Sequence, residues 1–134
     1  KSRDKNLYNF KILESMEKTL VPTSSNSLVI NRGAGEKEYI KLDYIAVKKA
    51  AMVLRSINHK LRQQMIRLLE DHKRMTVTEI YVKLRLEQSV ASQHLAILRR
   101  AGIVITERDG KFIHYSINAQ RIAEIAGFVD DLVG

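Results

Sequence analysis

The chain has 134 residues, the length of a single domain, and its 23 Lys and Arg against 15 Asp and Glu give a net charge of +8, which favours a polyanionic partner. A hydrophobic share of 45% excludes wholesale disorder, and the absence of cysteine excludes disulfides, thiolate metal sites and thiol redox switches. No run of about 18 apolar residues is present and the first ten residues lack the apolar core of a secretion signal, so we expect a cytoplasmic protein with no membrane partner.

Residues 1–39 are interpreted as an N-terminal extension. Pro22 and the polar residues after it break the chain, and the segment Asn31 to Gly35 breaks it again. Between the breaks, Leu28 to Ile30 suggest a short extended segment. Before Pro22 a short amphipathic helix is expected, because apolar residues recur there at steps of three and four, namely Leu7, Phe10, Leu13, Met16 and Leu20. Residues 40–134 then form the domain, with 16 basic against 10 acidic residues and a net charge of +6.

Helical periodicity starts at Leu42 and predicts four successive helices. Their apolar stripes are, in chain order, Leu42, Ile45, Ala46, Ala50, Val53, Leu54 and Ile57; then Leu61, Met65, Leu68 and Leu69; then Val77, Ile80, Tyr81 and Leu84; and last Ala91, Leu95 and Leu98. Asn58 is the expected N-cap of the second helix. Thr76 and Glu79 have the spacing of a capping box at the start of the third. A tight link of residues 85–87 leads into the fourth helix, which Gly102 ends.

The period changes from helical to two after Gly102. Residues 103–106 and 112–117 are rich in β-branched and aromatic side chains, and the Asp109-Gly110 pair between them is a strong hairpin signal. Asn118 then caps a last helix with an apolar stripe of Ile122, Ile125, Ala126, Val129, Leu132 and Val133. The sequence therefore predicts a mostly α fold with a small β-hairpin, in the order α-α-α-α-β-β-α, which describes a winged helix-turn-helix.

The fourth helix, around residues 88–100, carries a face of short polar side chains opposite its apolar stripe. These are Gln88, Ser89, Ser92 and Gln93, and such amides and hydroxyls suit base edges in the major groove. The alternative is an ordinary solvated helix face. That face would carry several Glu, Asp or Lys residues, and none occurs from Gln88 to Leu98. We therefore predict that this helix reads double-stranded DNA.

The hairpin around residues 104–117 carries Arg108 and Lys111 beside its turn. As a wing, it would place these cations along a phosphate backbone or in a minor groove. A solvated turn explains the same residues equally well when the hairpin is considered alone. The reading helix directly before it favours the wing.

Three stretches of the chain resemble a known family: residues 57–62 at the second helix, 88–98 in the fourth helix, and 100–104 leading into the wing. They match the pattern Gln-Ser-x-x-Ser-x-His-Leu-x-x-Leu-Arg-x-Ala-Gly-Leu/Ile-Val, except that the first Arg is doubled. Residues 57–117 are thus similar to an ArsR-type winged-helix transcriptional repressor domain. The chain departs from that family at Lys60, where many members have proline. It departs again at Glu87, where many have a serine cap, so a less well capped helix start is expected.

The resemblance implies a homodimer, built from the first and last helices of the domain, that binds an inverted repeat in operator DNA. It assigns His94 a supporting part in the reading helix. The apolar stripes of the two outer helices exceed what a core of this size needs, so we expect a dimer surface made of Ile45, Val53, Ile122, Ile125 and Val129. Nothing in these residues names an inducer.

Members of the family often sense metals, and the residues for that role are missing. Thr76 to Leu84 contain no thiol, and no histidine lies between Ala119 and Gly134. The four histidines, His59, His72, His94 and His114, lack the spacing of a ligand set. No cofactor, no metal and no enzymatic activity are therefore predicted. Two alternatives stay open: a metal or small-ligand sensor with oxygen and nitrogen ligands, and a winged helix that serves as a protein-interaction module.

Overall fold

The computed structural model of the protein describes residues 26–33 and 39–134. The chain divides into two compact units, Lys1–Ala51 and Met52–Gly134, and the division falls inside a helix. The short helix expected over Leu7 to Leu20 lies outside the described residues. The domain boundary expected at residue 39 remains a prediction.

The first unit contains an antiparallel hairpin of β1 (Ser27–Asn31) and β2 (Tyr39–Asp43), in which Leu28 pairs with Leu42. The extended segment expected at residues 28–30 is therefore confirmed, whereas the expectation that the helix starts at Leu42 is wrong. Residues 39–43 alternate, so that Ile40 and Leu42 share one face of the hairpin with their β1 partners Ile30 and Leu28. Helix α2 begins only at Tyr44, where the Asp43 carboxylate accepts a hydrogen bond from the Ile45 amide at 2.9 Å.

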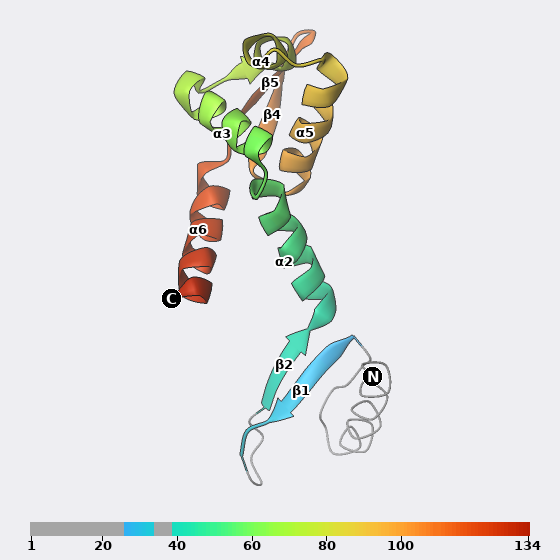
Figure 1. Ribbon diagram of the computed structural model, residues 1–134, viewed down its shortest axis with the longest axis vertical. Coiled ribbons are helices and arrows are strands. Elements are labelled where there is room, and N and C mark those ends of the chain that lie inside the picture. The colour runs from blue at the N-terminus through green and yellow to red at the C-terminus, as the bar shows by residue number, and fades with distance from the viewer. Residues whose placement is uncertain (1–25, 34–38) are drawn as a thin grey trace. The chain divides into compact units, whose positions relative to one another are not determined.

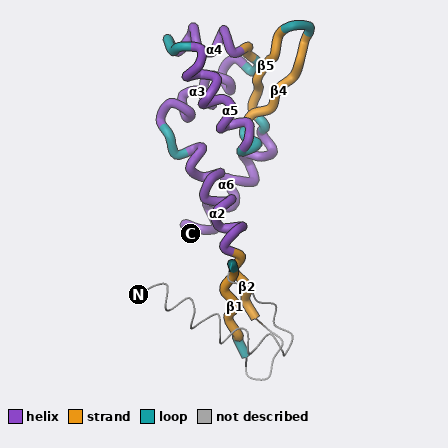
Figure 2. Tube along the Cα trace, turned by 90° about the vertical axis from the view of Figure 1, so that its right-hand side faces the viewer, coloured by secondary structure: helices purple, strands orange, loops and turns teal. Residues whose placement is uncertain are grey.

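The second unit has the predicted order of helices and hairpin (Figure 1). Its elements are the end of α2 (Tyr44–Ile57), α3 (Lys60–His72), β3 (Met75–Thr76), α4 (Val77–Leu84), α5 (Gln88–Arg100), β4 (Val104–Asp109), β5 (Phe112–Ile117) and α6 (Ala119–Val133). The short strand β3 was not predicted. It pairs with β5 and makes a three-stranded sheet of order β3-β5-β4, whose two long strands lie to one side of the helices in Figure 2.

The core of this unit lies between α3, α4, α5 and the base of the sheet. Seven large side chains in it are fully buried: Met65, Leu69, Ile80, Leu95, Leu98, Ile103 and Val104. Each of them belongs to a predicted helical stripe or to the first strand of the predicted hairpin. Burial of this apolar surface is the main stabilising term for a domain of this size.

Local capping fixes where the helices begin. Thr76 and Glu79 form the predicted capping box, with the Thr76 hydroxyl accepting from the Glu79 amide at 3.2 Å and the Glu79 carboxylate accepting from the Thr76 amide at 2.8 Å. Asn118 caps α6 as predicted. The cap of α3 is His59 rather than Asn58, because the His59 Nδ1 atom accepts from the Arg62 amide. No helix in the described part of the chain is long and apolar enough to span a membrane.

Candidate nucleic-acid interface

Helix α5 presents one buried and one exposed face, as its sequence predicts. The side chains of Ala91, Leu95 and Leu98 are completely buried, which turns the opposite face outward. The four predicted base readers, Gln88, Ser89, Ser92 and Gln93, are all exposed on that face. The Glu87 side chain makes no cap hydrogen bond, as expected from the missing serine. The helix therefore offers short polar groups to solvent over its first two turns.

The end of α5 is fixed by glycine. Gly102 has a φ of +79°, and its amide donates to the Arg99 carbonyl at 2.9 Å while the Ile103 amide donates to the Leu98 carbonyl at 3.0 Å. These two bonds form a Schellman motif, which favours glycine because an L side chain is strained at positive φ. The chain is thereby turned from α5 into β4 within three residues.

The link between α4 and α5 is a tight turn that places a cation directly before α5. Arg85 adopts a left-handed conformation with a φ of +58°, and the Leu86 amide donates to the Tyr81 carbonyl at 2.9 Å. The Arg85 side chain is exposed. Sequence reasoning did not single it out, although a basic residue in the turn of a helix-turn-helix is a visible signal for phosphate contact.

The wing turns at the predicted Gly110, but its turn is shorter than the sequence suggests, because β4 continues through Asp109 and leaves only Gly110 and Lys111 between the strands. Asp109 pairs with Phe112, and Gly110, with a φ of +66°, is the first turn residue, the position where a type II′ turn takes glycine. The Lys111 ammonium lies 5.6 Å from the centroid of the Phe112 ring, and Arg108 is exposed on β4. The tip of the hairpin and the start of α5 lie at the same end of the unit in Figure 1.

The acidic residues of the wing are turned away from Arg108. Strand alternation puts Glu107 and Asp109 on one face of the hairpin and Arg108 on the other. The Arg74 guanidinium lies 3.8 Å from each of these two carboxylates. The pairs are largely exposed, so they contribute little stability. Their effect is to offset negative charge on the face opposite Arg108.

His94 does not share the exposed face of α5. Helical spacing places it on the other flank of the buried stripe, where it is half-buried and its Nδ1 atom lies 3.1 Å from the Arg62 guanidinium. Its ring centroid is 4.9 Å from that of His59. Burial, then His59, then Arg62 lower the pKa of His94 below its usual 6.5. Sequence reasoning missed Arg62, because a buried arginine in a polar helix position has no distinctive pattern.

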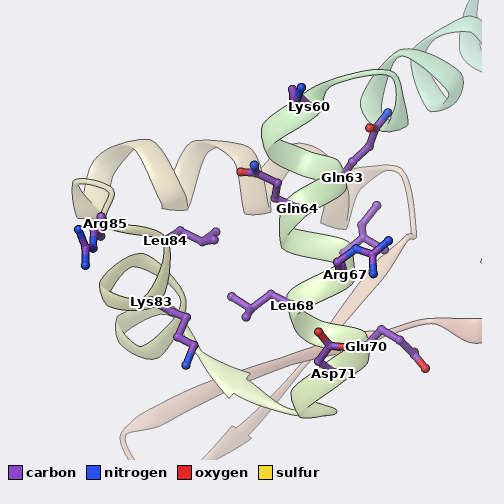
Figure 3. A pocket seen from close by; sticks show the side chains of 11 residues that line it. Lys60, Gln63, Gln64, Arg67, Leu68, Glu70, Asp71, Lys83, Leu84 and Arg85 are labelled. Carbon is purple, nitrogen blue, oxygen red and sulfur yellow. The ribbon is translucent and has the colours of Figure 1, made fainter.

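A groove of about 940 Å³ runs between α3 and α4. In Figure 3, Leu68 and Leu84 point toward each other across it from the two helices. The groove is also lined by basic, acidic and amide side chains: Lys60, Gln63, Gln64, Arg67, Glu70, Asp71, Lys83 and Arg85. This mixture does not select for one sign of charge. Among the described residues, no three His, Asp or Glu side chains are grouped so that they could hold a metal ion.

The five residues predicted for the dimer surface have different environments within one chain. Ile125 is buried in the core at 9% exposure, and Val53, Ile122 and Val129 are half-buried against it. Ile45 is exposed. On α6 the largest exposed apolar side chains are Phe128, Leu132 and Val133, of which only the last two belong to the stripe that was predicted.

Comparison with known proteins identifies the family. The model of the bacterial regulatory proteins of the arsR family matches residues 59–106. The transcriptional repressor PagR of Bacillus anthracis is 34% identical over 85 residues, which are 63% of this chain and 85% of PagR. Its crystal structure has a TM-score of 0.51 to this protein at 32% identity, over 67% of this chain and 99% of PagR.

A second relative is the transcriptional activator HlyU of Vibrio cholerae, which is 34% identical over 74 residues, 55% of this chain and 68% of HlyU. The structure of HlyU has a TM-score of 0.51 at 31% identity, over 65% of this chain and 90% of HlyU. The predicted resemblance is thus confirmed by sequence and by structure. This chain belongs to the arsR family of bacterial regulatory proteins, and it is a DNA-binding transcriptional regulator with a winged helix-turn-helix rather than an enzyme.

Proposed function

We propose that this protein is a homodimeric repressor that binds an inverted-repeat operator with α5 and the wing. The observation that carries the proposal is the division of α5 into a completely buried stripe and an exposed face of Gln88, Ser89, Ser92 and Gln93. A folded helix that keeps four short polar side chains in solvent, without carboxylates, is suited to the major groove of DNA.

Each group in the proposed interface has a chemical role. Gln88 and Gln93 can each form a bidentate pair with adenine, and the hydroxyls of Ser89 and Ser92 can donate to a base or to a phosphate. Arg108 and Lys111 contact phosphates from the wing, which positions the helix without reading sequence.

Dimerisation rests on apolar surface that a single chain leaves in solvent. On α6, Phe128 is 47% exposed and Leu132 is 68% exposed, one turn apart. On α2, Ile45 is 48% exposed and Met52 is 57% exposed. Exposed apolar side chains of this size favour a protein partner. A second copy fits best, because an inverted repeat requires two reading helices related by a twofold axis.

The repressor role is supported by the similarity to PagR, a transcriptional repressor, whereas the similarity to HlyU, a transcriptional activator, favours the opposite role. A reporter gene placed downstream of an operator, which is first recovered from random DNA, decides between the two roles. Expression should rise when the regulator is deleted, whereas a fall would make the protein an activator.

The base-reading role is tested with Gln93→Ala and a matched control, Gln64→Ala, which removes an exposed glutamine from α3. We measure competition between an operator, recovered from random DNA, and its single-base variants. Gln93→Ala should lose about 1–3 kcal/mol of discrimination at one position in each half-site, and Gln64→Ala should lose none. Unchanged preference in both variants would show that this face of α5 is merely solvated.

The dimer is tested by sedimentation of Phe128→Glu, with Gln120→Glu as a control that adds the same charge to an exposed polar position of α6. Phe128→Glu should sediment as a monomer and lose operator affinity, because a monomer reads only one half-site. A wild-type chain that sediments as a monomer would contradict the proposed symmetry. DNA binding that is weak and insensitive to salt would instead favour the protein-interaction module.

A further inference from the structure

Arg62 is a buried cation that joins three helices. Its side chain belongs to α3 and the residue is only 7% exposed. Its Nε donates to the carbonyl of Ser56 at 2.6 Å and its Nη2 donates to the carbonyl of Arg55 at 3.2 Å. Its Nη1 lies 3.1 Å from the Nδ1 atom of His94 on α5. Among the described residues, no carboxylate forms an ion pair with Arg62.

The contacts of Arg62 with α2 explain how a buried cation is stabilised without an acid. Arg55 and Ser56 lie in the last turn of α2, whose carbonyls have no partner inside the helix. These carbonyls carry the negative end of the helix dipole, and a cation there is favourable. Arg62 is therefore anchored to the end of α2 by two hydrogen bonds, and the orientation of its guanidinium is fixed.

The third contact holds the reading helix. Arginine has only donors, so the Nδ1 atom of His94 must accept, which leaves the ring proton on Nε2. His59 is held in the same way, because its Nδ1 atom accepts from the Arg62 amide at 3.4 Å. The two imidazoles then meet at 4.9 Å between ring centroids. The geometry requires a neutral His94.

We infer that Arg62 and His94 are positioning residues for DNA recognition, because their hydrogen bond fixes the orientation of α5 relative to the end of α2. This inference rests on the proposed function, since it concerns how well the exposed face of α5 is aligned with bases. It removes His94 from the base-reading set and gives it an internal role. It also connects α2, a helix of the proposed dimer surface, directly to the helix that reads DNA.

Protonation of His94 breaks the connection. A protonated ring presents an N–H instead of a lone pair to the Arg62 guanidinium, so two donors face each other. The charged groups that face His94 are Arg62 from α3 and His59 before it, and both oppose a positive charge there. Sequence selectivity should therefore fall as the pH drops through the pKa of His94 in the folded protein, which burial and the two neighbouring groups hold below the ordinary 6.5.

The test measures the ratio of operator affinity to random-DNA affinity at pH 7.5 and pH 5.5. This ratio cancels the general gain in DNA binding that added positive charge gives at low pH. The first variant is His94→Gln, whose amide oxygen can accept a hydrogen bond from Arg62 but is not protonated in this pH range. The second is Arg62→Lys, which keeps the positive charge but loses the planar guanidinium with its several N–H donors. His72→Gln, at the exposed end of α3, is the matched control. Urea unfolding establishes that each variant is folded at both pH values.

In the wild type and in His72→Gln the ratio should fall at pH 5.5, by at most the factor of about fivefold to tenfold that one completely lost hydrogen bond represents. In His94→Gln it should not change with pH. In folded Arg62→Lys it should be low at both pH values. The inference is overturned if His94→Gln keeps the pH dependence of the wild type, or if folded Arg62→Lys keeps wild-type selectivity. Should Arg62→Lys not fold, His94→Gln decides alone.

A measurement without DNA separates this inference from the proposed function. Nitrogen NMR of the free wild-type chain at pH 7.5 should find His94 as the tautomer protonated at Nε2. A proton on Nδ1 would overturn the link with Arg62 even if DNA binding is selective. A wild type that binds all DNA sequences equally would contradict the proposed function, while the tautomer would still decide whether the link exists.

Discussion

Replacing Leu95 by alanine should destabilise the protein by about 3–4 kcal/mol. Leu95 has no exposed surface and packs in the core of the second unit. The substitution removes three carbon atoms, and at about 0.8 kcal/mol for each buried methylene the lost transfer energy is roughly 2.4 kcal/mol. The cavity left between the helices and the sheet adds the remainder, which brings the total within the range of about 2–5 kcal/mol for Leu→Ala in cores.

The assay is urea unfolding followed by circular dichroism, with Gln93→Ala as the control two residues away on the opposite face of α5. Leu95→Ala should lower the urea concentration at the midpoint of unfolding without changing the slope of the free energy of unfolding against urea concentration. Gln93→Ala should change the free energy of unfolding by about 0.5 kcal/mol or less, because its side chain is exposed. A loss below about 1 kcal/mol for Leu95→Ala would refute the assignment of the two faces of α5. A large loss for Gln93→Ala would refute it as well.

Three further predictions concern the wing, the end of α5 and pH. Arg108→Ala and Lys111→Ala should weaken operator and random-DNA binding by similar factors and reduce the salt dependence of affinity, measured by fluorescence anisotropy across a salt series; a change in sequence preference would contradict phosphate contact. Gly102→Ala should lower the free energy of unfolding, measured in urea, by about 1–2 kcal/mol, because the φ of Gly102 is +79°. Gly127→Ala, inside α6 with open space around the added methyl group, should leave the free energy of unfolding unchanged or raise it by up to about 1 kcal/mol. A larger loss of stability for Gly127→Ala than for Gly102→Ala would contradict the Schellman end of α5. Because the pKa of His94 is lowered in the folded protein, His94 of the unfolded chain is protonated at a higher pH than His94 of the folded chain. The free energy of unfolding should therefore decrease as the pH falls below about 6.5 and reach a plateau below the folded pKa. Urea midpoints that decrease equally in His94→Gln would assign the effect to another group.

Much of the second unit follows from the order of its sequence patterns. The capping box at Thr76, the cap at Asn118 and the glycine turn at Gly110 are local signals, because each depends on residues within four positions of one another. Such signals need no tertiary information, and all three are confirmed. The buried stripe of α5 was predicted for the same reason, since Ala91, Leu95 and Leu98 repeat at helical spacing.

The missed features depend on residues that are far apart in the chain. Strand β3 has two residues, and only its pairing with β5 defines it. Leu42 continues the helical stripe in sequence, but its pairing with Leu28 places it in a strand. The link between Arg62 and His94 spans 32 positions, so neither residue signals the other. The cap of α3 is His59 and not the predicted Asn58, and here too a distant residue is involved, because the His59 ring also packs against His94.

The central claim is that α5 and the wing read a specific DNA sequence, and selection of bound DNA from a random pool tests it most directly. The full chain is incubated with random duplexes near physiological salt, and bound duplexes are recovered and sequenced over several rounds. We predict enrichment of two inverted half-sites whose centres lie about one helical turn, roughly 34–36 Å, or a multiple of it apart. If the protein binds DNA in every round but the recovered sequences remain random after several rounds, the claim is contradicted.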